Sequence, residues 1–222
     1  MRKINNTYKN VPRDNRAFSE MLMSAIERVG HLQPEAIALK SGAVFHKKKA
    51  VIVLKSLNQE VRIKFPEYCF YPQIEDWHQL VILHYLDLAD GSAVSSQIIP
   101  FGELKNGMIR GTKFDRDMEK ELQRFLRGKT PECIRQICES LGADFIDSNS
   151  DLCAVFPFLP NYPVWLKIWL ADEEFEASGK FYLSRSADHY LTIEDAVTVG
   201  DILLSKLKTQ EKELFKNGNN ET

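Results

Sequence analysis

Hydrophobic residues recur at helical spacing in several separate segments of the chain. Residues 15–29 carry one apolar stripe, and residues 77–88 are apolar on most sides of a helix, which indicates a central position. The sequence Thr-Lys-Phe-Asp at 112–115 matches a capping box, so we expect a helix that begins there. Thr130 and Pro131 supply the N-cap and the first turn of another helix.

Apolar and polar residues alternate in the segments that we expect to form strands. Two strands of a hairpin are predicted at 50–54 and 60–65, and three further strands are predicted at 151–156, 163–171 and 179–184. In the strand at 163–171, one face is aliphatic and the other presents Trp165, Lys167 and Trp169. A second capping box, Thr-Ile-Glu-Asp at 192–195, begins the last helix.

Helices and strands come in blocks rather than in strict alternation. This order favours an α+β fold, with a mostly antiparallel sheet and packed helices, over a doubly wound sheet. We expect a single domain over residues 15–208, with flexible termini at 1–14 and 209–222.

The charge of the chain is nearly balanced overall but uneven along the sequence. The 222 residues include 29 basic and 31 acidic side chains, for a net charge of −2, which argues against a nucleic-acid-binding protein. Residues 1–142 carry 22 basic and 17 acidic side chains, whereas residues 143–205 carry 3 and 11. The second region is therefore an acidic lobe.

No signal peptide and no membrane-length apolar stretch is visible, so we expect a soluble cytoplasmic protein with no membrane partner.

Four cysteines are present, and we expect all of them to be reduced thiols in that compartment. Cys133 stands at the third position of its predicted helix, where a thiol pKa can fall. No histidine follows it at a recognisable spacing, so a nucleophilic role for this cysteine is disfavoured.

Residues 163–178 and 186–195 resemble the C-terminal signature of a family catalogued as domain of unknown function 3786, found in anaerobic bacteria and archaea. His-Tyr-Leu at 84–86 and Phe-Gly-Glu-Leu at 101–104, followed by Gly107, resemble its weaker motifs. The chain departs from the family pattern at Ala171 and Glu176. The resemblance spans about residues 15–207 and implies a context in anaerobic cofactor metabolism, but no reaction and no particular cofactor.

An acidic turn stands next to the aromatic strand. Asp172, Glu173, Glu174 and Glu176 supply four carboxylates within five residues. We expect this turn to lie within contact distance of the segment 186–195 and to border, with Trp169, a concave site. Phe175 would then pack on Tyr190 and Leu191. The alternative is a solvated hairpin turn.

Two histidines complete the candidate site. His189 follows Asp188 and precedes the last helix, and either a proton-transfer group or a structural loop histidine fits that position. His84 lies on the stripe of the helix at 77–88, where it is either a core histidine or a group that faces a pocket. If Asp195 caps the last helix, we expect its carboxylate to be occupied and not free for a ligand. The candidate ligand-binding residues are His84, Trp169, Asp172, Glu173, Glu174, Ser186 and His189.

Three functions are consistent with these features. The first is a binding or accessory protein, because an aromatic face beside carboxylates suits a cationic or flat organic molecule. The second is a metal-assisted hydrolase that uses the carboxylates at 172–176 and His189. The third is a protein–protein interaction module whose acidic lobe binds a basic partner. The first is favoured because no nucleophile–base pair can be named.

Overall fold

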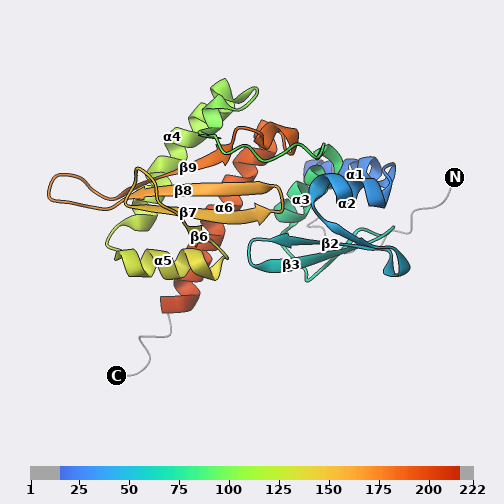
Figure 1. The fold of residues 1–222 in the computed structure, drawn as a ribbon, viewed down its shortest axis with the longest axis horizontal. Coiled ribbons are helices and arrows are strands. Elements are labelled where there is room, and N and C mark those ends of the chain that lie inside the picture. The colour runs from blue at the N-terminus through green and yellow to red at the C-terminus, as the bar shows by residue number, and fades with distance from the viewer. Residues whose placement is uncertain (1–15, 216–222) are drawn as a thin grey trace.

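Two antiparallel sheets organise residues 16–215, the part of the chain that the structure, a computed structural model, describes (Figure 1). The helices are α1 (Arg16–Gly30), α2 (Pro34–Ser41), α3 (Asp76–Leu88), α4 (Gly107–Leu126), α5 (Pro131–Ser140) and α6 (Ile193–Phe215). Three short 3-10 turns are η1 (Lys47–Lys49), η2 (Phe101–Glu103) and η3 (Ala187–His189).

The first sheet has the strand order β1-β2-β3-β4; α2 packs on β1, and both α1 and α2 pack on α3. Its strands are β1 (Val44–His46), β2 (Val51–Ser56), β3 (Gln59–Lys64) and β4 (Cys69–Tyr71). β2 and β3 form the predicted hairpin. Val61 and Ile63 point into the core, and Arg62 and Lys64 point to solvent, as the alternation predicts. The helix predicted at 77–88 is α3, which is buried on most of its sides.

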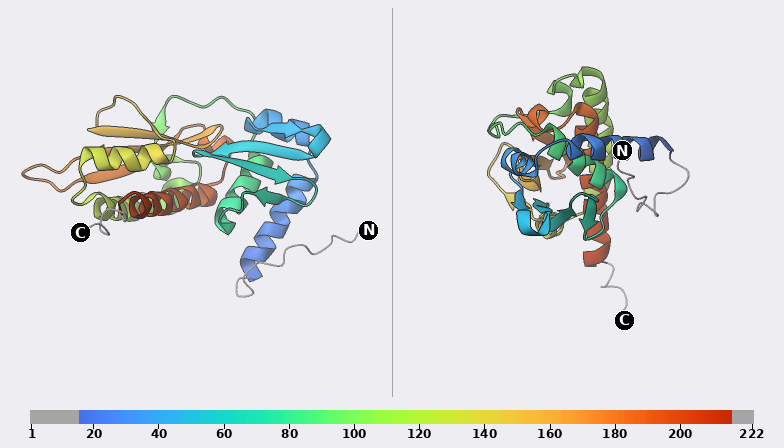
Figure 2. Two further views of the ribbon diagram at one scale, coloured as in Figure 1. Left: turned by 90° about the horizontal axis from the view of Figure 1, so that it is seen from below. Right: turned by 90° about the vertical axis from the view of Figure 1, so that its right-hand side faces the viewer.

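The second sheet has the order β5-β9-β8-β7-β6. Its strands are β5 (Ile98–Ile99), β6 (Asp144–Phe145), β7 (Leu152–Leu159), β8 (Tyr162–Trp169) and β9 (Ser178–Ser184). One face of β8 is buried, and Trp165, Lys167 and Trp169 on the other face are half-buried, as expected. Figure 2 shows α4 and α6 side by side along the sheet, and α4 packs directly on β9.

A continuous hydrophobic core joins the two sheets. At their junction, the Leu57 N–H donates to the carbonyl oxygen of Pro157 at 2.9 Å, and the Ser56 hydroxyl donates to that of Phe158 at 2.8 Å. α3 from the first half of the chain also packs on α6 from the second half. The chain is therefore a single α+β domain, as the order of its elements predicts.

Helix α4 begins at Gly107, five residues before the capping box that we expected to start it. Gly107, Gly111 and Asp115 are four residues apart and share one face of α4. The turn η2 lies on this face so closely that a Cβ atom at either glycine would overlap the carbonyl group of Phe101. The Asp115 carboxylate accepts hydrogen bonds from the N–H groups of Phe101, at 3.1 Å, and Gly102, at 2.9 Å. It therefore caps η2 instead of its own helix.

Two other expectations need correction. Residues 69–71, for which we predicted no strand, form β4. We expect a flexible C-terminus from residue 209, but α6 continues to Phe215, and Glu211 within it forms an ion pair with Lys129 at 2.7 Å. The predictions for residues 1–14 and 216–222 lie outside the described residues.

Candidate functional site

The acidic turn lies at the free end of the β8–β9 hairpin, which projects to the left in Figure 1. Trp169 ends β8 beside this turn, whereas the segment 186–195 follows Ser184 at the opposite end of β9. A strand of seven residues spans about 20 Å. The expected contact between the turn and the segment 186–195 is therefore wrong. The chain would have to return along the whole sheet to make it.

The turn is held by its own backbone and, through Glu176, by an ion pair with Arg127 at the end of α4 at 3.1 Å. Asp172 Oδ1 accepts hydrogen bonds from the N–H groups of Glu174, at 2.8 Å, and Phe175, at 2.7 Å, and these bonds lower the pKa of Asp172. Phe175 is 69% exposed and does not pack on Tyr190 or Leu191. Within residues 16–215, no group of three or more His, Cys, Asp or Glu side chains is placed to hold a metal ion. The turn therefore has the geometry of a solvated hairpin tip, and Glu173 is exposed like its neighbours.

Ser186 has a structural role. Its hydroxyl accepts a hydrogen bond from Ser95 N–H at 2.9 Å and shares another with Ser184 at 2.8 Å. The Ser184 hydroxyl in turn donates to the Ser95 carbonyl at 2.9 Å. These bonds fasten the loop that precedes β5 to the end of β9.

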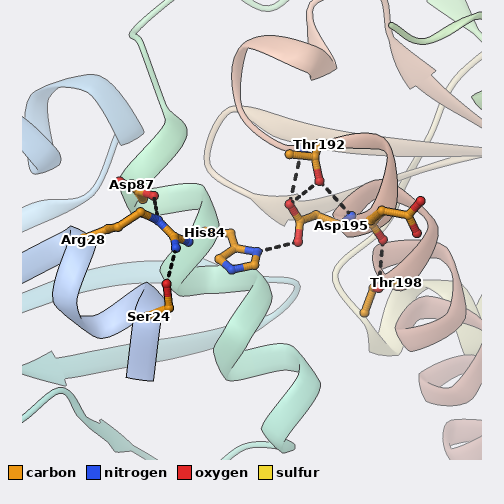
Figure 3. Close-up of polar contacts among 8 residues, drawn as sticks. Ser24, Arg28, His84, Asp87, Thr192, Asp195 and Thr198 are labelled. Atoms are coloured by element: carbon orange, nitrogen blue, oxygen red, sulfur yellow. Dashed lines mark hydrogen bonds and ion pairs between the residues drawn. The ribbon is translucent and has the colours of Figure 1, made fainter. Parts of the chain in front are cut away.

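His84 and Asp195, which are 111 residues apart, form a hydrogen-bonded pair between α3 and the start of α6 (Figure 3). His84 Nδ1 lies 2.6 Å from Asp195 Oδ1, and the side chains are only 19% and 10% exposed. The other nitrogen of the ring, Nε2, has no hydrogen-bond partner among residues 16–215. An ionised carboxylate only accepts hydrogen bonds, so Nδ1 carries a proton and a neutral His84 has its lone pair on Nε2.

The second oxygen of Asp195 belongs to the helix cap. Asp195 Oδ2 accepts from the Thr192 hydroxyl at 2.7 Å and from the Thr192 N–H at 3.3 Å, and Thr192 Oγ1 accepts from the Asp195 N–H. The predicted capping box is thus confirmed, but it uses only one of the two carboxylate oxygens. Burial by itself raises the pKa of Asp195, but the hydrogen bonds from His84 and Thr192 outweigh it and hold the pKa below its ordinary value.

His84 lines a cavity of about 460 Å³ between α1, α3, α4 and α6. The wall is mostly apolar, with Trp77 the largest side chain in it, and is completed by Met21, Leu80, Val81 and Leu88. Two guanidinium groups also line the cavity. Arg28 pairs with Asp87 at 2.6 Å, and Arg110 pairs with Glu194 at 3.0 Å.

The family model described as Domain of unknown function (DUF3786) matches residues 33–206, which include both residues of the His84–Asp195 pair. The chain belongs to this family. No curated protein and no solved structure shows significant similarity to it. Among residues 16–215, no helix is long and apolar enough to cross a membrane.

Several residues in the segments that resemble family motifs have structural roles. The Tyr85 hydroxyl donates to the Ser41 carbonyl at 2.6 Å and accepts from Asn161 N–H at 3.0 Å, and its ring stacks on Tyr190. Gly107 allows the close approach of η2 to α4. These contacts join elements of the scaffold. His84 differs from them because its ring is left with an unpartnered nitrogen.

His189 forms a second, more exposed pair. Its Nδ1 lies 2.7 Å from Asp90 Oδ2 and 3.1 Å from Ser92 Oγ. The hydrogen bond to Asp90 raises the pKa of His189, and the same bond, with those from Ser92, lowers the pKa of Asp90 to about 2. His189 lines a separate cavity of about 420 Å³, which shares Leu88 and Thr192 with the cavity of His84.

Apart from Ser186, the candidate residues therefore fall into two groups. His84 and His189 lie on neighbouring cavities at the junction of the two halves of the chain. Trp169 and the carboxylates of Asp172, Glu173 and Glu174 lie at or near the hairpin tip. Asp195 and Asp90 lie outside the candidate set, and no short-range sequence signal links either one to its histidine.

Cys133 stands where a helix N-terminus can lower a thiol pKa, but burial raises the pKa of its thiol instead.

Proposed function

We propose that this DUF3786 protein binds a small, flat organic molecule in the cavity lined by His84. The observation that carries the proposal is the His84–Asp195 pair, in which Nε2 of the ring has no hydrogen-bond partner among residues 16–215, in a cavity lined by both apolar side chains and two guanidinium groups. Binding sites typically combine an apolar lining with a few polar groups that orient the ligand. This is the binding or accessory role that the sequence favoured, at a different place in the fold.

The lining specifies the chemistry of the ligand. Trp77 is 46% exposed and offers a ring face on which a planar molecule can stack. His84 Nε2 accepts a hydrogen bond from an N–H or O–H group of the ligand. Arg28 and Arg110 each have five N–H donors, more than their present partners use, so both suit an anionic substituent.

Fluorescence of Trp77 tests the proposal directly. In a Trp165→Phe/Trp169→Phe variant, Trp77 is the single tryptophan and reports on the cavity. Anilinonaphthalene sulfonate is a suitable probe, because it has a flat apolar body, an N–H donor and an anionic group. We expect saturable quenching of Trp77 and an increase in probe emission.

Two variants locate the binding. Leu88→Arg should abolish it by filling the cavity, whereas Leu39→Arg, on the exposed surface of α2, should leave it unchanged. His84→Gln should weaken binding about five-fold, because a hydrogen bond contributes about 1 kcal/mol. Equal binding by the wild type and Leu88→Arg would contradict the proposal.

The cytoplasmic location and the link with anaerobic cofactor metabolism rest on the sequence and on the family resemblance. Genes that adjoin family members test the metabolic link. Recurrent neighbours that encode cofactor-dependent enzymes would support it, and neighbours of unrelated function would contradict it.

Phe175 favours a second candidate function, an interaction module. An exposed aromatic side chain among carboxylates at a projecting tip suits a partner with an apolar surface rimmed by basic residues. A helical peptide of alternating lysine and leucine is a defined probe for this tip. Phe175→Ser should weaken its binding, whereas Leu39→Ser, at another exposed apolar position, should not. Equal affinities would exclude the tip as the binding surface.

A further inference from the structure

We propose that His84 is a general base that removes a proton from the molecule bound in its cavity, so that the protein is an enzyme of the proton-transfer type. This inference rests on the proposed function and deepens it. The substrate class is a small, flat molecule that carries an acidic C–H, N–H or O–H bond and an anionic group.

The geometry around His84 is that of an oriented base. Asp195 Oδ1 lies 2.6 Å from Nδ1, which fixes both the ring and its tautomer and leaves the Nε2 lone pair available. Thr192 holds the other carboxylate oxygen, so Asp195 cannot rotate away from the ring. When Nε2 accepts a proton, the imidazolium ion that forms lies directly against this carboxylate. Asp195 is therefore a positioning residue that also stabilises the charged product.

The charged groups around the cavity come from all four helices. Arg28 on α1 pairs with Asp87 on α3, and Arg110 on α4 pairs with Glu194 on α6. Both pairs are complete before a substrate binds, so neither carboxylate competes with Asp195 for the His84 proton. The same guanidinium groups can stabilise negative charge that develops on the substrate when the proton leaves.

Covalent catalysis fits this cavity less well. The two hydroxyl groups in its lining already donate hydrogen bonds, Thr192 to Asp195 and Thr198 to the carbonyl oxygen of Glu194. No cysteine or serine lines the cavity within the described residues. A reaction that needs only a base is consistent with these groups. His84 takes the proton, and the electron pair of the broken bond stays on the substrate.

Nitrobenzisoxazole tests base activity without knowledge of the natural substrate. A base removes the C–H proton of its five-membered ring, the electron pair forms the C≡N bond, and the N–O bond breaks to release coloured cyanonitrophenolate. The reaction needs neither a metal nor a nucleophile, and the proton passes from His84 to water. The flat apolar ring system of nitrobenzisoxazole suits the part of the cavity lined by Trp77.

We expect saturable turnover by the wild-type protein, faster than by the same concentration of free imidazole. General-base catalysis typically contributes 100-fold or more, so His84→Gln should lower the rate about 100-fold. Asp195→Asn should cause a similar loss, because an amide can donate to Nδ1 and place the proton on Nε2, a change that nitrogen NMR of the ring detects directly. His46→Gln, at an exposed position on β1, is the matched control and should react like the wild type.

A wild-type rate no faster than free imidazole, or a His84→Gln variant as active as the wild type, overturns the proposal. If anilinonaphthalene sulfonate still quenches Trp77 in that case, the binding function stands and only proton transfer fails. If anilinonaphthalene sulfonate does not quench Trp77, both proposals fail together.

Discussion

Replacement of Gly111 by alanine tests the close contact between η2 and α4. At an exposed helical position, this change would stabilise a protein by about 1 kcal/mol, because alanine is the better helix former. Here the new Cβ atom would lie 2.8 Å from Gly102 N and still closer to the carbonyl group of Phe101. The contacted atoms are backbone, so the turn must move away from the helix.

The size of the effect follows from what the movement breaks. Asp115 lies one turn further along the same face of α4 and holds η2 through two hydrogen bonds to its carboxylate. Each such bond contributes about 1.5 kcal/mol, so the loss is about 3 kcal/mol. After subtraction of the helix-propensity gain of about 1 kcal/mol, we expect a net destabilisation of about 2 kcal/mol.

Urea denaturation followed by far-ultraviolet circular dichroism measures this free energy of unfolding. Lys120→Ala, at an exposed position of the same helix, is the control and should change stability by less than about 0.5 kcal/mol. In an Asp115→Ala background, Gly111→Ala should cost less than it does alone, because the bonds that it breaks are already missing. A Gly111→Ala protein more stable than the wild type would refute the close contact.

Three other predictions concern the cap, the second histidine and the thiols. Thr192→Ala should lower the free energy of unfolding by about 1 kcal/mol, because it removes the N-cap of α6, whereas Thr192→Ser should be about as stable as the wild type. Equal urea midpoints for the alanine variant and the wild type would count against the cap. The His189–Asp90 pair should stabilise the fold most between pH 3.8 and 6.5, the ordinary pKa values of its two groups. That stabilisation should fall as the pH drops toward the lowered pKa of Asp90 and as it rises through the raised pKa of His189, so Asp90→Asn should flatten the dependence of the urea midpoint on pH. All four cysteines should react with a thiol reagent after the protein is unfolded without reductant. Fewer than four reactive thiols in protein kept from air would show a disulfide. In the folded protein, Cys138 should react slowest, because burial raises the pKa of its thiol to about 12.

The elements that the sequence predicts well are those whose periodicity reflects burial. The alternation at 163–171 matches β8, and the apolar character of 77–88 matches the central helix α3. These patterns are local consequences of which faces meet the core. Helix α2 was not predicted, and it has few core residues because only Ile37, Ala38 and Ser41 are buried.

The start of α4 shows why a local motif can mislead. Residues 112–115 have the spacing of a capping box, but Thr112 lies inside the helix and Asp115 binds a turn that is distant from it in sequence. Two glycines near a helix start would ordinarily argue against helix there. Tertiary contact with Phe101 reverses that argument, and no local pattern reports such a contact.

The expected contact between the acidic turn and residues 186–195 was wrong for a related reason. The carboxylates at 172–176 are conspicuous because they are adjacent in sequence, but adjacency at a hairpin tip leaves them in solvent. The partners that matter, His84 and Asp195, are far apart in sequence and meet only when α3 packs on α6.

Asp195 also shows the limit of assigning one role to one residue. We expected that a capping aspartate would have no carboxylate oxygen to spare, yet Oδ2 serves the cap and Oδ1 serves His84. Under the proposed function, the cap also serves the site, because it fixes the carboxylate that orients the ring. His78, on the same helix, provides the contrast. It is buried, bonds to Ser56 at 2.8 Å, and has a pKa lowered to about 4 by burial, so it stays neutral within the core. His84 is six residues further along α3, at the junction with α6, and there a histidine can meet both a carboxylate and a cavity.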